Sequence, residues 1–291
     1  MSSSKRDRRV NRRLLLLGAV AGPWLAVAAR AEAPAPKPDP APGPWPAEFR
    51  VLEPKALELL KSSSARLSAA RTMTFTAVMG DESPSRLGPP LLYETQSLVA
   101  LERPDKLRVI TTSDGPRTEL YYNGTSLSAF VPGENLLATT KAPPGIDAAL
   151  RAAHEMAHVY YPFADVIVAN PFGDLSPDLR LAFYVGQSGV VGGTTTDVVA
   201  YATDEVFIEV WIGAEDKLPR RFRAIYVKDP LQLRHEMELS SWRIDSILSP
   251  ATFELPAAAR TARPMPFGRP EAPAPRAGPP APATAPPAAP K

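Results

Sequence analysis

The segment His154-Glu155-Met156-Ala157-His158 has the residue types and spacing most specific for chemistry in this sequence. Histidines four residues apart lie on one face of a helix, where both could bind the same zinc ion. The glutamate between them could act as a general base on a zinc-bound water. The pattern defines one hypothesis, a zinc-dependent hydrolase that uses His154, Glu155 and His158.

A catalytic zinc also needs a third protein ligand, and this sequence does not offer one at the usual spacing. The extended motif requires Gly and His where Tyr161 and Ala164 stand, and Asp165 lies one residue out of step. We therefore favour an ordinary packing helix whose apolar stripe is flanked by His154 and His158. We expect no metal site.

Other catalytic signatures are missing from the sequence. The chain contains no cysteine, which excludes disulfides, thiolate nucleophiles and a lipid-modified cysteine. The segment 186–190 is not a G-x-S-x-G nucleophile elbow, because Val190 stands where the second glycine is needed. Neither the dinucleotide-binding nor the P-loop glycine pattern occurs. We expect a protein that is not an enzyme and has no cofactor.

The first 31 residues are typical of an export signal. Six Lys or Arg residues precede an apolar run, and Ala29-Arg30-Ala31 provides small residues for cleavage before Glu32. The apolar run is shorter than the ~20 residues of a membrane-spanning helix, which favours cleavage over anchoring. Arg12-Arg13 keeps twin-arginine export open beside the general secretory (Sec) route. We predict a periplasmic protein with no transmembrane anchor after cleavage.

Net charge indicates the class of partner of the remaining chain, and proline content indicates where its folded domain begins and ends. Cleavage removes seven Lys or Arg and one Asp, so the net charge changes from +2 to −4, which disfavours nucleic acid as a partner. Of the 35 prolines, seven lie in residues 32–46 and eleven in residues 264–291, which predicts a disordered linker and a disordered tail. Residues 47–263 are then one domain, large enough for a single core.

Hydrophobic periodicity predicts two helices and many strands in this domain. Residues 53–70 place apolar side chains on one helical face, and a second helix at 146–161 divides the strands into two groups. Asn123-Gly124 predicts a type I′ hairpin turn, in which both central residues have positive φ. The strands are expected at 73–80, 91–102, 106–113, 117–122, 125–131, 135–140, 179–187, 195–202, 205–213, 219–228, 232–243 and 252–255.

These elements predict a mainly β (α+β) fold. A long run of antiparallel strands with few helices favours a curved antiparallel sheet, an open half-barrel with helices packed in or over its concave face. Such a sheet can enclose an apolar cavity, although alternation does not tell which face is concave. Six aromatic residues are the candidates for the cavity lining: Phe75, Phe130, Tyr160, Phe163, Trp211 and Trp242.

From about Ala56 to Pro256, or about 200 of 291 residues, the chain resembles a bacterial family of predicted periplasmic proteins, domain of unknown function 2092. The segments that carry the resemblance follow the family's order: ALELLKSSSARLSAARTMTF (56–75), RPDKLRV (103–109), LYYNGTSLSAFVPGENLLATTKAP (120–143), YPFADVIVANPF (161–172), YVGQSGVVGG (184–193), VWIGAEDKLPRRFRAIYVKD (210–229) and LSSWRID (239–245).

The resemblance implies a LolA/LolB-like fold, similar to periplasmic lipoprotein carriers and their outer-membrane receptors. Family members have Cys-Asp-His where this chain has Thr196-Asp197-Val198, so no role of that cysteine or histidine transfers, and the family has no assigned catalytic residues. The leading hypothesis is an apolar cavity that binds a lipid, an acyl chain or a lipidated protein, gated by the helical region 146–160. The alternatives are an envelope sensor or scaffold that docks a protein partner by its sheet edge or proline-rich tail, and the zinc hydrolase.

Overall fold

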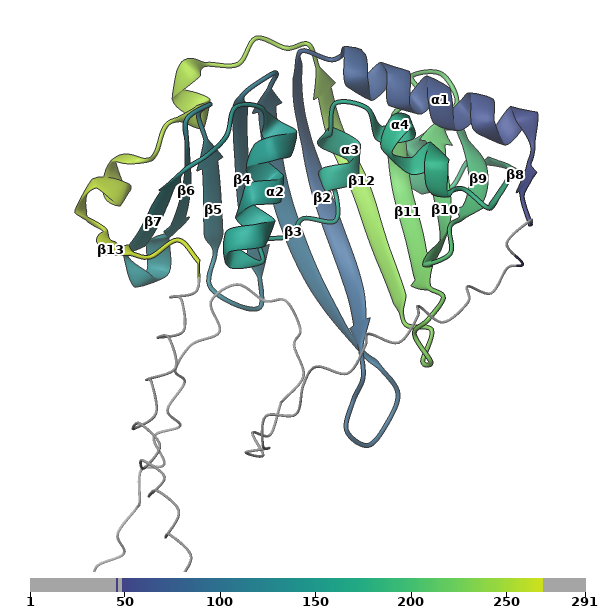
Figure 1. Ribbon diagram of the computed structural model, residues 1–291, viewed down its shortest axis with the longest axis horizontal. Helices are drawn as coiled ribbons and strands as arrows, with labels where there is room; N and C mark the ends of the chain where they lie inside the picture. Colours follow the sequence, from purple (N-terminus) through teal and green to yellow (C-terminus); the bar gives the residue numbers. More distant parts are fainter. Residues whose placement is uncertain (1–45, 47–48, 269–291) are drawn as a thin grey trace, which may run out of the picture.

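The computed structural model describes Pro46 and residues 49–268 of the 291-residue chain. The expected signal peptide (1–31), nearly all of the linker (32–46) and residues 269–291 lie outside the described residues, so these assignments stay predictions. Residues 49–268 form one large sheet with four α-helices, as Figure 1 shows. The predicted mainly β fold is confirmed.

The sheet has thirteen strands and is built outward from its centre. Strand β2 pairs with β3 on one side and with β12 on the other, and antiparallel neighbours continue to both edges. The edge strands β1 and β13 pair in parallel with β8 and β7, so the sheet is open rather than closed. The strands are β1 (Val51–Leu52), β2 (Thr72–Ser83), β3 (Leu91–Glu102), β4 (Lys106–Ser113), β5 (Thr118–Tyr122), β6 (Ser126–Val131), β7 (Leu136–Lys141), β8 (Leu181–Ser188), β9 (Thr196–Ala202), β10 (Val206–Gly213), β11 (Pro219–Tyr226), β12 (Arg234–Ile244) and β13 (Arg263–Met265).

All four helices cover one face of the sheet, which we call the inner face (Figure 1). Helix α2 lies over the β2–β7 half, and α1 extends across the ends of β8–β11 with α4 beside it. The bounds are α1 (Pro54–Ala69), α2 (Ile146–Ala157), α3 (Ala164–Ile167) and α4 (Pro171–Leu175). Bulges in β8, β11 and β12 bend the strands, which lets so wide a sheet curve around its helices.

Strand alternation explains why the inner face is apolar. Along β2, residues Met73, Phe75, Ala77 and Met79 point inward, and none is more than 8% exposed. They belong to a large core beneath α2 and α3, whereas a second core lies between α1 and strands β8–β10. Phe222 of β11 packs against both cores. The two cores therefore meet under the helices near β11.

The first predicted helix is confirmed as α1, within one residue of its expected ends. Pro54 fits the first turn of α1, because an N–H at this position would have no acceptor within the helix and its absence in proline costs nothing. Glu53 precedes it and accepts a hydrogen bond from the Tyr184 backbone N–H at 2.8 Å. This bond connects the start of α1 to strand β8.

The strands predicted between 73 and 243 are confirmed as β2–β12, with ends that differ by a few residues. The predicted strand at 252–255 is wrong, because Pro250–Phe253 forms a 3-10 helix in which the Thr252 N–H donates to the Ser249 carbonyl at 2.9 Å. Proline at the start of this segment has no N–H for a strand ladder.

Two local predictions need correction. The second helix ends at Ala157 rather than at residue 161, because His158 adopts a left-handed conformation (φ 54°) and caps the helix with its N–H. The hairpin after β5 has Gly124 and Thr125 at its centre, and Gly124 alone of the two has positive φ. This is the pattern of a type II′ rather than a type I′ turn. The Asn123 side chain accepts hydrogen bonds from the N–H groups of Thr125 and Ser126, which holds this alternative.

The segment 250–262 crosses the outer face of the β4–β7 half, and the chain then passes around the β7 edge to the inner face. Phe253 and Ala259 are buried in this segment, and β13 then pairs with β7. Arg108 of β4 donates to the Thr252 carbonyl at 3.4 Å, and Phe267 packs against the inner core. Ordered structure thus continues past residue 263, the expected end of the domain.

Leu101→Ala is expected to lower the free energy of unfolding by about 3 kcal/mol, because it leaves a cavity in the inner core. Leu101 is fully buried on β3, whereas Leu98 of the same strand is 46% exposed on the outer face. Leu98→Ala is the matched control and should change stability by less than about 1 kcal/mol. Urea denaturation measures both. Equal losses in the two variants would contradict the assignment of the inner face.

Candidate functional site

Three of the six predicted cavity residues lie together on the inner face. Phe75 of β2 stands 5.8 Å from Phe163 and 4.5 Å from Trp242 of β12, measured between ring centroids. Phe163 stacks in turn on Tyr161 at 5.1 Å. Phe75 and Phe163 are at most 3% exposed, so this aromatic group is packed core beneath the 158–163 connection. Its rings fill space that a ligand would need.

The other three candidates lie apart from this group. Tyr160 is 58% exposed and faces His154, with ring centroids 6.4 Å apart. Phe130 points to the outer face, because its neighbours Leu127 and Ala129 pack against the inner core. By the same alternation Trp211 points outward, since Val210 and Ile212 belong to the inner core beneath α1. Its ring lies 6.0 Å from the guanidinium carbon of Arg221.

The zinc motif does not form the arrangement its spacing predicts. The rings of His154 and His158 stand 6.1 Å apart between centroids and nearly perpendicular, and helix α2 ends before His158. The two histidines and Glu155 are exposed. Among Pro46 and residues 49–268, no group of three or more His, Cys, Asp or Glu side chains is placed to hold a metal ion.

An apolar pocket of about 290 Å³ lies on the inner face, in the other half of the sheet. Helix α1 and the segment 165–178 form its walls, and strands β9, β10 and β11 form its floor. Its lining residues are Leu60, Ser63, Ser64, Leu67, Asp165, Val166, Val168, Pro171, Phe172, Asp174, Leu175, Asp178, Tyr201, Thr203, Val206, Ile208, Val210, Ile212, Pro219 and Phe222.

Local hydrogen bonds position the α4 wall of this pocket. Asn170 caps α4 by accepting from the Gly173 N–H at 3.1 Å, and the Phe172 N–H donates to the Ser64 hydroxyl of α1 at 2.9 Å. A Cβ at residue 173 would clash with the Asn170 amide, so a larger residue there would displace the Asn170 side chain from the cap. Helix α4 is therefore held against α1 as one wall.

Two hydrogen bonds from outside the pocket hold the connection between α3 and α4. The Ala169 N–H donates to the Asp147 carboxylate of α2 at 3.0 Å, and Arg103 donates to the Val168 carbonyl at 3.1 Å. Sequence reasoning missed both short helices, although Asn170-Pro171 is a helix-start signal, a cap residue followed by proline.

The charged side chains that line this pocket are all acidic: Asp165, Asp174 and Asp178, beside the hydroxyls of Ser63, Ser64, Tyr201 and Thr203. Asp165 is reached by solvent, yet it lies within the pocket, and burial followed by the charge of Asp174 raises the pKa of its carboxyl. Burial, and secondarily the charge of Asp165, raises the pKa of the Tyr201 phenol. Tyr201 therefore stays protonated at neutral pH. The pocket offers an apolar surface, a phenol hydroxyl and carboxylates.

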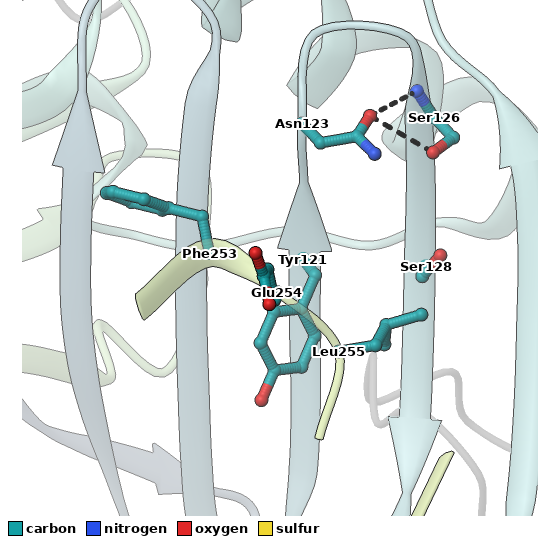
Figure 2. Close-up of a pocket in the computed structure, with 7 residues that line it drawn as sticks. All are labelled: Tyr121, Asn123, Ser126, Ser128, Phe253, Glu254 and Leu255. Carbon is teal, nitrogen blue, oxygen red and sulfur yellow. Dashed lines mark hydrogen bonds between the residues drawn. The ribbon is translucent and has the colours of Figure 1, made fainter. Parts of the chain in front are cut away.

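A second hollow of about 220 Å³ lies on the outer face, under the segment 250–262. Figure 2 shows that Phe253, Glu254 and Leu255 cross strands β5 and β6 there, above Tyr121 and Ser128. Its polar groups already have partners. The Tyr121 hydroxyl donates to Glu119 at 2.6 Å, and Ser128 and Thr139 hydroxyls lie 3.0 Å apart. The inner pocket is the better candidate site.

Asp165→Asn is expected to raise the free energy of unfolding at pH 7, because folding places the ionised carboxylate of Asp165 at a disadvantage. The pKa of Asp165 in the folded chain lies above its unfolded value near 3.8. The difference in free energy of unfolding between the variant and the original chain should therefore grow as pH rises from the unfolded pKa through the folded pKa, and it should vanish at lower pH. Urea denaturation at several pH values measures this. Asp114→Asn, in an exposed loop, is the control, and a difference that stays constant with pH would contradict the expectation.

Comparison with solved structures gives several distant similarities. The MucA/MucB complex of Pseudomonas aeruginosa matches with a TM-score of 0.39 and 13% identity, over 70% of this chain and 62% of that chain. LprF from Mycobacterium bovis matches with a TM-score of 0.41 and 14% identity, over 68% and 96%. The LolA superfamily protein NE2245 from Nitrosomonas europaea matches with a TM-score of 0.30 and 11% identity, over 69% and 97%. The chain spans less than two thirds of the MucB chains it matches.

A search among curated proteins gave no match. In the part of the chain that the structure describes, no helix is long and apolar enough to cross a membrane. A family model described as a predicted periplasmic protein matches residues 56–265, which is most of the chain and agrees with the export signal read from the sequence. The chain belongs to this periplasmic family, DUF2092.

Proposed function

We propose that this periplasmic protein is a non-enzymatic binding protein that holds an apolar chain, from a lipid or a lipidated protein, in the pocket between α1, α4 and strands β9–β11. The observation that carries the proposal is the pocket itself. Its volume of about 290 Å³ is close to the ~300 Å³ at which small-molecule sites begin. Its floor is formed by aliphatic and aromatic side chains of the sheet, among them Ile208, Val210 and Phe222.

Burial of a hydrocarbon chain supplies the binding energy in this proposal. Each methylene transferred from water to such a surface contributes about 0.8 kcal/mol. Phe172 and Leu175 of α4 and Leu60 of α1 face the floor, so a chain between them would contact apolar atoms on several sides. A site of this kind needs no reaction chemistry, and within residues 49–268 the pocket's polar groups include no hydrogen-bonded nucleophile and base.

The packing of the elements beside the pocket indicates which of them could move to admit a ligand. We expected the region 146–160 to gate entry, but α2 packs on the other core through Ile146, Ala149 and Ala153, each at most 2% exposed. The pocket wall that could move is instead α4, a five-residue helix with no buried residue, held against α1 by the bond between the Phe172 N–H and Ser64. Movement of α4 alone would open the pocket without disturbing the buried Val166 and Ile167 of α3.

Binding to an envelope protein remains the alternative. The proline-rich tail that could dock such a partner lies mostly outside the described residues, so this version stays a prediction. Each sheet edge carries a short parallel strand of the protein itself, β1 on β8 and β13 on β7. These strands occupy part of each edge to which a partner strand would have to add. The pocket is therefore the stronger basis for function.

Ile208→Trp is expected to weaken binding of a neutral fluorescent apolar probe, N-phenyl-1-naphthylamine, by at least about tenfold. The larger ring displaces two or more methylene equivalents of probe contact, and ~1.4 kcal/mol is tenfold. Fluorescence titration measures the affinity. Ile247→Trp is the matched control, because Ile247 is fully exposed away from the pocket, and it should bind as the original chain does.

The proposal fails if the original chain shows no saturable binding of the probe. It also fails if Ile208→Trp and Ile247→Trp bind equally well while both keep the original circular dichroism spectrum and unfolding midpoint.

A further inference from the structure

Tyr201 of β9 is a buried residue whose hydroxyl has no hydrogen-bond partner within residues 49–268. The residue is 6% exposed and lines the pocket. Tyr121 and Tyr122 are similarly buried, and their hydroxyls donate to Glu119 and to the Pro143 carbonyl. Polar groups of buried side chains normally have such partners, so the free hydroxyl of Tyr201 in the pocket indicates a place for a polar ligand atom.

The carboxylates around this hydroxyl also lack cationic partners. Asp165 and Asp174 both line the pocket, and within residues 49–268 neither forms an ion pair or a side-chain hydrogen bond. The charge of Asp165 acts on Tyr201 and that of Asp174 acts on Asp165, so the three groups are electrostatic neighbours. Like charges that share a pocket without a counter-ion repel each other, and a cation between them would replace that repulsion with attraction.

Two basic residues close to this wall have other contacts and do not line the pocket. Lys61 of α1 lies over the ring of Phe172, 5.5 Å from its centroid, and it is not part of the pocket lining. Arg180 forms an ion pair with Asp204 at 2.8 Å. An anionic head group in the pocket would therefore meet carboxylates with no lining Lys or Arg to offset them.

We infer that the pocket selects amphiphiles that carry a protonated amine at the polar end of the apolar chain. Asp165 and Asp174 would face the ammonium group, and the Tyr201 hydroxyl oxygen would accept one of its N–H groups. This inference rests on the proposed function, because it assigns the head group of the same ligand. It excludes free fatty acids as the preferred cargo and names cationic amphiphiles in their place.

Three probes share a ten-carbon chain and differ only in the head group, so they distinguish the contribution of the head group to affinity from that of the chain. They are decylammonium, decanol and decanoate. Isothermal titration of the exported protein at pH 7, below the micelle concentration of each probe, gives the three affinities. Decylammonium should bind at least about tenfold more tightly than decanoate, with decanol between them, as expected for attraction replacing repulsion at two partly solvated carboxylates.

Variants assign the preference to named residues. Asp165→Asn and Asp174→Asn should each reduce the ratio of decylammonium to decanoate affinity about threefold, and Tyr201→Phe should weaken decylammonium more than decanol. Asp114→Asn removes the same charge from an exposed loop outside the pocket and should leave the ratio unchanged.

The outcomes distinguish the two proposals. Equal affinity for the three probes, or tighter binding of decanoate, would overturn the cationic preference while the apolar pocket stands. A preference that Asp114→Asn lowers as much as Asp165→Asn would also overturn it, since net charge would then be the cause. If none of the probes binds, the apolar pocket itself is lost, and the head-group inference with it.

Discussion

The inner face of a thirteen-stranded open sheet has to be removed from water, and the rest of this structure depends on that constraint. Four helices of 16, 12, 4 and 5 residues are short cover for so wide a surface. They bury it as two cores, one beneath α2 and α3 and one beneath α1. The cores meet at Phe222, and the pocket lies at this junction between them. The site is thus a consequence of how the sheet is buried.

Much of the fold follows from periodicity in the sequence, and the exceptions have physical causes. Alternation located β2–β12 and a 3.6-residue period located α1, because these elements are long enough to repeat. Helices α3 and α4 are too short for a period, and the left-handed cap at His158 depends on one residue's conformation. Alternation also shows which residues of a strand share a face, but it does not show which face is the inner one. Phe75 and Trp242 therefore proved to be inner residues, whereas Phe130 and Trp211 point outward.

The pocket's polar residues could not be identified in this way. Tyr201 is one of several tyrosines in alternating strands, and Asp165 lies in the first turn of α3, where carboxylates are common in any helix. Their relation exists only after β9, α3 and α4 come together in space.

The short parallel pairs at the two sheet edges give the molecule a mechanical asymmetry. β1 has two residues and leads directly into α1, a wall of the pocket, through the bond between Glu53 and Tyr184. β13 has three residues and continues from the segment that crosses the outer face, away from the pocket. Tension applied at the N-terminal side would thus reach the pocket wall after two residues of pairing. Tension at the C-terminal side would first detach the segment on the outer face, so pulling at the two ends of the domain would affect the pocket to different extents.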